Sequence, residues 1–235
     1  GNGRRLSPRI QNESETMTPE ESKRRRLEMV HRQIECRGIR DSRVLEVLRE
    51  IPRENFVPPE FRDQAYTDGP LAIGRGQTIS QPYIVALMTE AMELRSDQVA
   101  LEIGTGSGYQ AAILAKLCRW VYTLERLPEL SRSAAERVEK LGLANLTFLV
   151  GDGTLGFPAE APYDAIMVTA GAPDVPQALL SQLADGGRLV IPVGDRNRQM
   201  LLQIRKKGTE YIHKELCACV FVPLLGEQGW REEKP

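Results

Sequence analysis

Short apolar runs alternate with amphipathic stretches along the second half of the chain. The apolar runs predict strands near residues 99–103, 120–125, 146–150, 163–169 and 188–193. The stretches between them predict helices near residues 109–117, 128–141 and 176–183. Strands that alternate with helices in this way form parallel sheets with right-handed crossovers. The pattern therefore predicts an α/β protein with a doubly wound, mostly parallel sheet.

The chain before this alternation predicts helices and then a long loop. The segment 18–21, Thr-Pro-Glu-Glu, has the cap, the proline and the glutamate of a helix start, and the apolar stripe that follows ends near Gly38. Asp41 is positioned to cap a second, shorter helix. Residues 53–81 are loop-rich, and long irregular segments inside compact enzymes are usually functional. A third helix is expected over residues 82–93.

Two further apolar runs follow the alternation. Residues 200–205 and 216–222 are separated by a turn around Gly208, with too few residues for a parallel crossover, so they predict an antiparallel hairpin at the sheet edge. For the domain organisation, we expect a flexible tail over residues 1–17 and a single domain over residues 18–235. That domain divides into an N-terminal helical and loop segment, residues 18–81, and a Rossmann-like core with the C-terminal hairpin, residues 82–235.

Composition and charge narrow the class of protein. The chain is 41% hydrophobic and 27% charged with a net charge of -1, which is typical of a soluble globular protein. The near-neutral charge disfavours a nucleic-acid binder that works by neutralising phosphates. The four cysteines form no Cys-x-x-Cys pair and only two histidines are present, so neither a metal site nor a disulfide framework is expected. Without an apolar run for a membrane span or a signal-peptide pattern, a cytoplasmic location is expected.

The candidate chemistry centres on a glycine-rich turn. Gly104, Gly106 and Gly108 stand at alternate positions between the strand that ends at Ile103 and the helix that starts at Tyr109. Glycines let a ligand approach the backbone at the positive end of the helix, so the turn is interpreted as a nucleotide-type cradle. A tight strand-to-helix turn without a ligand is the alternative interpretation.

The spacing of this turn excludes two nucleotide motifs. The dinucleotide fingerprint needs glycine at its sixth position, where this chain has Tyr109, and no Gly-Lys-Ser/Thr of a phosphate loop follows. Glu125 ends the next apolar run, about 20 residues beyond Gly104, where an acidic side chain can accept hydrogen bonds from both hydroxyls of a ribose. A nucleoside with a free ribose and no phosphate is therefore favoured, and S-adenosylmethionine fits that description.

Two other segments are candidates for ligand contacts. The carboxyl ends of the predicted strands bring Asp152-Gly153 and Thr169 to the same sheet edge as the glycine turn. This would place the Asp152 carboxylate near the adenine amino group, with room for the ring beside Gly153, although a plain Asp-Gly turn is the alternative. Ser80 precedes the third helix, so its hydroxyl could cap that helix, lie beside a ligand, or do both.

Several segments together resemble the protein-L-isoaspartate (D-aspartate) O-methyltransferase family. The glycine turn and Asp152-Gly153 are shared by many methyltransferases, whereas the Thr-Ile-Ser-Gln-Pro segment 78–82 and the Val-Pro-Leu segment 222–224 are much more specific. The other matching segments are residues 101–109, 150–153, 161–166, 176–179 and 186–194. The resemblance extends from about residue 28 to residue 230, and it implies the class I S-adenosylmethionine-dependent methyltransferase fold.

The resemblance also implies a repair reaction and a set of site residues. A methyl group moves from S-adenosylmethionine to the free α-carboxylate of an L-isoaspartyl or D-aspartyl residue in an age-damaged protein or peptide, and S-adenosylhomocysteine remains. The methyl ester then closes to a succinimide without the enzyme. The family's active-site serine corresponds to Ser80. Its cofactor-binding residues correspond to Gln77, Thr78, Ile79, Ser80, Glu102, Gly104, Glu125, Asp152 and Gly153.

The residues present agree with this chemistry. A free carboxylate has a reference pKa of about 3.3 to 3.7 and is ionised at neutral pH, so no general base is needed. Because damaged sites occur in arbitrary sequence, we expect recognition through backbone groups, with strand addition near residues 220–222. We expect a monomer that needs no metal and binds neither nucleic acid nor membranes. The alternatives are a methyltransferase for a small molecule or RNA, and a cofactor-binding regulatory or scaffold protein without catalysis.

Overall fold

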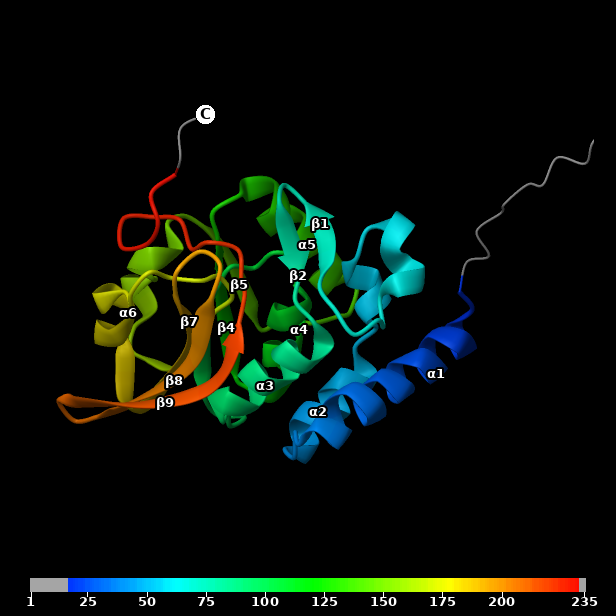
Figure 1. The fold of residues 1–235 in the computed structure, drawn as a ribbon, viewed down its shortest axis with the longest axis horizontal. Helices are drawn as coiled ribbons and strands as arrows, with labels where there is room; N and C mark the ends of the chain where they lie inside the picture. Colours follow the sequence, from blue (N-terminus) through cyan, green and yellow to red (C-terminus); the bar gives the residue numbers. More distant parts are fainter. Residues whose placement is uncertain (1–16, 233–235) are drawn as a thin grey trace, which may run out of the picture.

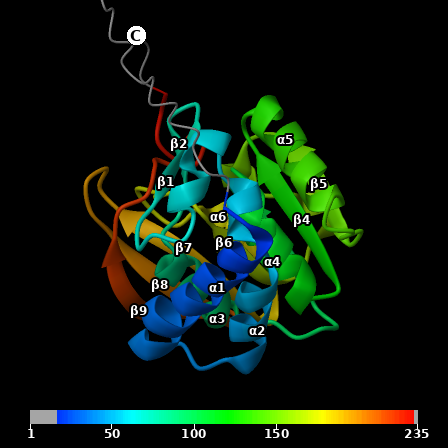
Figure 2. The same ribbon diagram turned by 90° about the vertical axis from the view of Figure 1, so that its right-hand side faces the viewer.

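The structure is a computed structural model that describes residues 17–232 (Figures 1 and 2). In this part of the chain the main sheet has seven strands, in the order β5-β4-β3-β6-β7-β8-β9. The strands are β3 (Val99–Ile103), β4 (Trp120–Glu125), β5 (Leu146–Val150), β6 (Tyr163–Val168), β7 (Leu183–Gly194), β8 (Gln199–Lys207) and β9 (Glu210–Cys219). Strands β3 to β7 pair in parallel, whereas β8 pairs antiparallel with both β7 and β9. The predicted mostly parallel sheet and its antiparallel C-terminal edge are confirmed.

Helices cover both faces of this sheet. They are α1 (Pro19–Met29), α2 (Ser42–Glu50), α3 (Pro82–Met92), α4 (Tyr109–Leu117), α5 (Pro128–Glu139) and α6 (Gln177–Ser181). On one face, Ala100 and Val121 share a core cluster with residues of α2, α3 and α4. On the other face, Leu101 and Ile166 pack with Leu179 of α6. Because neighbouring strand residues point to opposite faces, burial on both sides explains why these strands are continuous apolar runs in the sequence.

The N-terminal helices begin at the predicted caps. Thr18 Oγ1 accepts a hydrogen bond from the backbone N–H of Glu21 at 3.2 Å, and Asp41 accepts one from the N–H of Arg43 at 2.9 Å. After α1 the helical path continues as a π turn and a 3-10 turn and ends at Gly38, whose φ is 103°. Buried residues of this path belong to the same core cluster as α3 and α4, so the N-terminal segment packs directly on the helical layer (Figure 2).

The predicted tail, residues 1–17, lies outside the described residues except for Met17. The Met17 side chain is partly buried and packs against the main core cluster. Within residues 17–232, no helix is both long and apolar enough to span a membrane.

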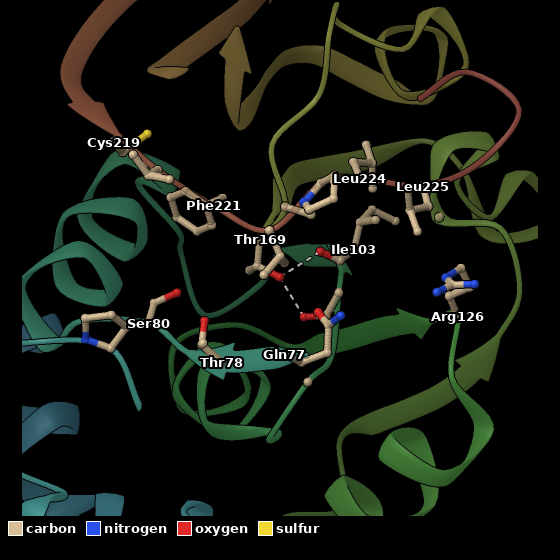
Figure 3. Close-up of a pocket in the computed structure, with 18 of the residues that line it drawn as sticks. Gln77, Thr78, Ser80, Ile103, Arg126, Thr169, Cys219, Phe221, Leu224 and Leu225 are labelled. Atoms are coloured by element: carbon tan, nitrogen blue, oxygen red, sulfur yellow. Dashed lines mark hydrogen bonds between the residues drawn. The ribbon is translucent and has the colours of Figure 1, made fainter. Parts of the chain in front are cut away.

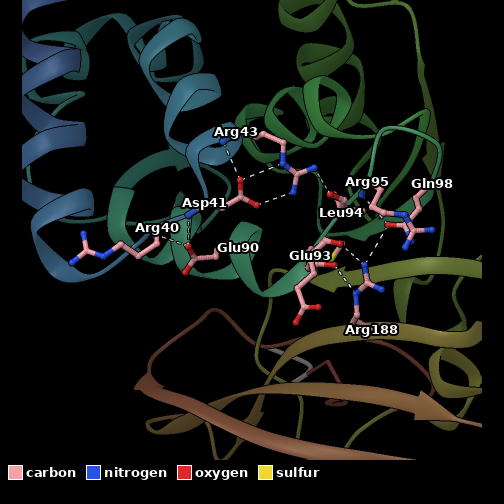
Figure 4. Close-up of polar contacts among 10 residues, drawn as sticks. Arg40, Asp41, Arg43, Glu90, Glu93, Leu94, Arg95, Gln98 and Arg188 are labelled. Carbon is pink, nitrogen blue, oxygen red and sulfur yellow. Dashed lines mark hydrogen bonds and ion pairs between the residues drawn. The ribbon is translucent and has the colours of Figure 1, made fainter.

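Polar contacts fix the C-terminal end of α3 (Figure 4). Glu90 Oε1 accepts hydrogen bonds from the backbone N–H groups of Arg40 at 2.6 Å and Asp41 at 2.8 Å, which links α3 to the start of α2. The buried Arg188 of β7 donates to the carbonyls of Met92 and Glu93. The last carbonyls of a helix have no partner within the helix, so Arg188 satisfies them and ties α3 to the sheet.

Several boundaries differ from the prediction. β7 begins at Leu183 instead of near residue 188. Its pairing with β6 is irregular between Leu183 and Arg188, so the strand includes Gly186 and Gly187, which were expected to lie outside it. α6 is shorter than residues 176–183. β9 covers Glu210–Cys219 and not residues 216–222, since a polar edge strand needs no apolar run. After Cys219 the chain turns away, and the carbonyl of Val222 accepts a hydrogen bond from the N–H of Gly171 at 2.8 Å.

A small hairpin stands where the sequence predicted a loop. β1 (Leu71–Gly74) and β2 (Gln77–Ile79) pair antiparallel through a turn at Arg75 and Gly76, which have φ values of 54° and 69°. The Gly-Arg-Gly turn between two short segments was the available signal, but strands this short carry little apolar periodicity. The hairpin leads directly into Ser80 and the start of α3 (Figure 1).

Candidate active site

A cavity of about 490 Å³ lies at the carboxyl ends of the central strands. Gly104, which follows β3, Glu125, which ends β4, and Thr169, which follows β6, line its floor. Figure 3 shows Ser80 and Thr78 on one side and Leu224 and Leu225, from the segment after β9, on the opposite side. This is the edge at which open α/β sheets bind ligands, as the sequence predicted.

The glycine turn brings the backbone close to neighbouring elements. Gly104 has a φ of 95°, and a Cβ at this position would lie 2.3 Å from Thr169 Oγ1. The Thr169 hydroxyl is shared as a donor between two backbone carbonyls, that of Gly104 at 2.7 Å and that of Ile103 at 3.0 Å (Figure 3). Gly108 has a φ of 87°, and its Cβ would lie 2.9 Å from the Cβ of Ala134 on α5. Both glycines are therefore required by backbone conformation and by packing.

The Glu125 carboxylate is held by the backbone. Oε2 accepts a hydrogen bond from the N–H of Gly106 at 2.9 Å, and Oε1 accepts one from the N–H of Leu127 at 3.0 Å. The side chain is only 7% exposed, and the residue lines the cavity. Each carboxylate oxygen has further acceptor capacity. Glu125 is thus preorganised to accept two hydrogen bonds from a diol.

The β1–β2 hairpin and the residue after it supply most of the predicted residues on the wall that faces Leu224. Gln77, Thr78 and Ser80 line the cavity. The capping position of α3 is Gln81, without a side-chain hydrogen bond, so the interpretation of Ser80 as the helix cap is wrong. Within the described residues the Ser80 hydroxyl has no recorded hydrogen bond, which leaves it available to a ligand. Its carbonyl accepts a hydrogen bond from Arg53 Nη2 at 2.8 Å.

Two of the predicted residues lie beneath the cavity surface. Ile79 is 4% exposed and lines a smaller hollow of about 40 Å³ beside the main cavity. Glu102 is completely buried, and its Oε2 accepts a hydrogen bond from Thr123 Oγ1 at 2.5 Å, whereas Oε1 has no partner. Burial raises the pKa of Glu102 to about 8. A contact between Glu102 and the cofactor therefore stays a prediction, because Glu102 does not itself line the main cavity among the described residues.

Asp152 faces the C-terminal segment. Its Oδ1 accepts hydrogen bonds from the N–H of Thr154 at 2.9 Å and from Thr154 Oγ1 at 2.7 Å, and its Oδ2 accepts one from the N–H of Glu227 at 2.8 Å. The turn interpretation of Asp152-Gly153 is thus confirmed, and the adenine contact of Asp152 stays a prediction. Gly153 lines the cavity, but the space for its Cβ is taken by Ile103 Cγ2, 2.3 Å away, and not left free for a ring.

Sequence reasoning missed most of the apolar wall. Ile103 and Leu124, at the ends of β3 and β4, line the cavity together with Phe221, Leu224 and Leu225. Leu224 and Leu225 are held there because the N–H of Leu224 donates to the carbonyl of Gly171 at 2.8 Å. The family-specific Val-Pro-Leu segment, residues 222–224, was the feature of the sequence from which this part of the wall could have been predicted. Within residues 17–232, no group of three or more metal-ligating side chains is found.

Comparisons with known proteins agree on one family. The profile described as "Protein-L-isoaspartate(D-aspartate) O-methyltransferase (PCMT)" matches residues 24–229. Protein-L-isoaspartate O-methyltransferase 2 of Pelobacter propionicus is 56% identical over 208 residues, which are 88% of this chain and 92% of the relative. The protein-L-isoaspartate O-methyltransferase of Methanoculleus marisnigri is 52% identical, over 92% of this chain and 99% of the relative.

A solved structure supports the same assignment. It is a putative protein-L-isoaspartate O-methyltransferase from Plasmodium falciparum in complex with S-adenosyl-L-homocysteine, with a TM-score of 0.74 and 26% identity over 85% of this chain and 98% of that chain. Because the family profile covers most of the sequence and the relatives are more than half identical, this chain belongs to the protein-L-isoaspartate (D-aspartate) O-methyltransferase family.

Proposed function

We propose that the cavity at the carboxyl ends of β3, β4 and β6 binds S-adenosylmethionine and the free α-carboxylate of an L-isoaspartyl or D-aspartyl residue side by side. Membership of the family makes the chain an S-adenosylmethionine-dependent protein carboxyl methyltransferase that acts in protein repair. The observation that carries the proposed site is that one cavity is lined by both Glu125, which suits a ribose, and Ser80, which suits a carboxylate.

The residues present fit S-adenosylmethionine. Glu125 would accept the two ribose hydroxyls, because both its oxygens are oriented by backbone N–H groups and retain acceptor capacity. Ile103, Leu124 and Leu225 offer apolar surface to a flat base. The open backbone of the glycine turn gives close access to the rest of the molecule. When bound, S-adenosylmethionine supplies an activated methyl group on a sulfonium.

Ser80 would orient the carboxylate and would not act as a nucleophile. Its hydroxyl is free to donate to a carboxylate oxygen, and such a hydrogen bond to a charged acceptor is short and strong. The substrate carboxylate is already ionised at neutral pH, so the chain need not remove a proton. What the residues must supply is alignment and exclusion of water, and proximity alone can contribute roughly 7 to 11 kcal/mol at best.

Cys219 does not compete for this role. It lines the cavity, but burial raises the pKa of its thiol to about 12. A thiol with this pKa stays protonated at neutral pH and is a poor nucleophile. The absence of a thiolate fits direct transfer of the methyl group to the carboxylate.

The peptide would bind beside the segment that follows β9. The family's substrates place isoaspartate in arbitrary sequence, so recognition through backbone groups is expected, and β9 is the edge strand of the sheet. The N–H of Phe221 already donates to Gln199 Oε1, and the carbonyl of Val222 accepts from Gly171. These contacts leave Val220, whose side chain is 71% exposed, as the position best placed to pair with an added strand.

The finer parts of the proposal concern partners and location. We take the enzyme to act as a cytoplasmic monomer on damaged polypeptides, and not on nucleic acids or membranes. The net charge of -1 supports a substrate other than a polyphosphate, and the cysteines have no disulfide within the described residues.

One assay separates this proposal from its alternatives. Purified protein is incubated with S-adenosylmethionine that carries a tritiated methyl group and with an isoaspartyl peptide, the matching aspartyl peptide, or RNA. Base-labile label on the isoaspartyl peptide alone supports the proposal. Stable label on RNA would support the alternative methyltransferase, and cofactor binding without transfer would support a regulatory protein.

A further inference from the structure

Arg53 is a completely buried cation with an unusual set of partners. Its side chain is 0% exposed, and among the described residues no carboxylate pairs with it. Nε donates to the carbonyl of Ala65 at 2.7 Å, Nη2 donates to the carbonyl of Ser80 at 2.8 Å, and Nη1 has no partner. Burying a charge is costly unless its hydrogen bonds are made, so a guanidinium kept here needs a reason beyond packing.

The bond to Ser80 fixes the peptide plane next to the proposed active-site hydroxyl. Ser80 lies between β2 and α3, and its own side chain makes no recorded hydrogen bond in the described structure. The peptide group is planar and side chains occupy discrete rotamers. Holding the carbonyl therefore restricts the directions in which the hydroxyl can point. A charge-assisted hydrogen bond from a guanidinium is stronger than one from a neutral donor.

The same guanidinium also contacts the helix that follows the glycine turn. The Cζ atom of Arg53 lies 5.1 Å from the ring centroid of Tyr109, the first residue of α4. A desolvated cation is stabilised over an aromatic face. Tyr109 is the residue that stands in place of the sixth-position glycine of a dinucleotide fingerprint. Its ring also packs against Phe56 in an edge contact, with centroids 5.4 Å apart.

We propose that Arg53 is a positioning residue for methyl transfer: it holds Ser80, on the carboxylate side of the cavity, in a fixed geometry relative to the glycine turn on the cofactor side. This inference rests on the proposed function of Ser80. Methyl transfer requires the carboxylate oxygen, the methyl carbon and the sulfonium sulfur to lie nearly in line. A misplacement of about 1 Å can cost about 100-fold in rate. A rigid link between the two sides of the cavity is therefore expected to affect catalysis more than binding.

Arg188 provides a matched control. It is also a buried arginine, 5% exposed, whose guanidinium donates to two backbone carbonyls, at the opposite end of α3 (Figure 4). Neither it nor its partners line the main cavity. Substitution of either arginine removes a buried cation and leaves carbonyls without donors, so both should lower stability. Only substitution of Arg53 should disturb Ser80.

The test compares Arg53→Met, Arg53→Lys and Arg188→Met in full-length protein, with an isoaspartyl peptide as substrate. Methionine keeps much of the length of the side chain without charge or donors, and lysine keeps the charge without the fork that reaches two carbonyls. We expect Arg53→Met to lower kcat about 10- to 100-fold, while the calorimetric Kd for S-adenosylhomocysteine stays within about threefold of wild type. Arg53→Lys should recover part of the loss, and Arg188→Met should retain the wild-type kcat.

A double substitution separates positioning from a general loss of structure. If Arg53 acts through Ser80, the variant Arg53→Met/Ser80→Ala should be no slower than Ser80→Ala alone, because the group being positioned is gone. The inference would be overturned if the losses of kcat in the two single variants multiplied in the double variant. It would also be overturned by a wild-type kcat in Arg53→Met, or by an equal loss of kcat in Arg188→Met. If Arg53→Met does not fold, the same cycle with Arg53→Lys decides. A wild-type protein that methylates no isoaspartyl peptide would reject the proposed function itself.

Discussion

At the scale of single residues, hydrogen bonds between side chains and backbone groups hold the site. Two N–H groups bind the Glu125 carboxylate, the N–H groups of Thr154 and Glu227 bind the Asp152 carboxylate, and the Arg53 guanidinium binds the backbone carbonyl of Ser80. Such groups are preorganised, because the fold sets their directions before a ligand arrives. Arg53 lies 27 residues before Ser80 in the chain, and the hydrogen bond between them depends on tertiary structure alone, which is why the sequence identified Ser80 and Glu125 but not Arg53.

Replacement of Ser80 by alanine should separate catalysis from cofactor binding. The loss of a hydrogen bond to a charged carboxylate, worth about 1.5–3 kcal/mol, should lower kcat about 10- to 100-fold. Cofactor affinity measured by calorimetry should stay within a few-fold, and the exposed Ser96→Ala variant serves as control. An equal loss of both quantities would identify Ser80 as chiefly a cofactor or folding residue.

Replacement of Glu125 by glutamine should weaken cofactor binding. The amide would set a donor against the N–H of Gly106 or Leu127 and would remove the charge proposed to bind the ribose hydroxyls. We expect the Kd for S-adenosylhomocysteine to rise about 10- to 100-fold. Calorimetry measures this, with the exposed Glu139→Gln as control. Unchanged affinity in Glu125→Gln would show that the ribose assignment is wrong.

Burial of Glu102 should make stability depend on pH. Its pKa is about 8 in the folded protein against 4.5 as the reference, so between these values the folded state holds a proton that the unfolded state has lost. The free energy of unfolding should then fall as pH rises through this window, by at most about 1.4 kcal/mol per pH unit from this group. Urea unfolding at pH 5 to 8 should show this fall in wild type relative to Glu102→Gln. Parallel pH profiles for the two proteins would contradict it.

At the scale of elements, the sequence predicted what two-sided burial determines. β3, β4 and β6 are continuous apolar runs because both faces are covered, and their ends carry Glu125 and the glycine turn. The β1–β2 hairpin was missed because it is short and has half-exposed residues. The start of β9 was misplaced because its residues 210–215 are mostly polar, and an edge strand is set by pairing with β8.

A proline in the segment after β9 should impair peptide binding. Val220→Pro removes an N–H that an added peptide strand could use, and it breaks no backbone hydrogen bond recorded within the described residues. We expect the KM for isoaspartyl peptides to rise several-fold with little change in cofactor affinity. The control is Val220→Ala, which keeps the N–H. A KM equal to that of the alanine variant would exclude strand addition at this position.

At the scale of the whole molecule, the fold brings the residues of the proposed cofactor and carboxylate sites to one sheet edge. The parallel half of the sheet supplies the glycine turn and Glu125, and the N-terminal segment supplies Ser80 through the β1–β2 hairpin. The segment after β9 closes the opposite side. The sequence indicated the cofactor through spacing along one strand-turn-helix unit. The shape of the cavity could not be predicted from the sequence, because that shape depends on how the β1–β2 hairpin and the segment after β9 are placed around the sheet edge.

Repair itself is the most direct test of this account. A pure isoaspartyl peptide is incubated with the enzyme and S-adenosylmethionine at neutral pH, and chromatography follows the peptide forms over time. The account predicts that the normal aspartyl peptide accumulates only when active enzyme and S-adenosylmethionine are both present, and that Ser80→Ala slows its appearance. An isoaspartyl peptide that persists unchanged, or an aspartyl peptide that is methylated equally well, would contradict it.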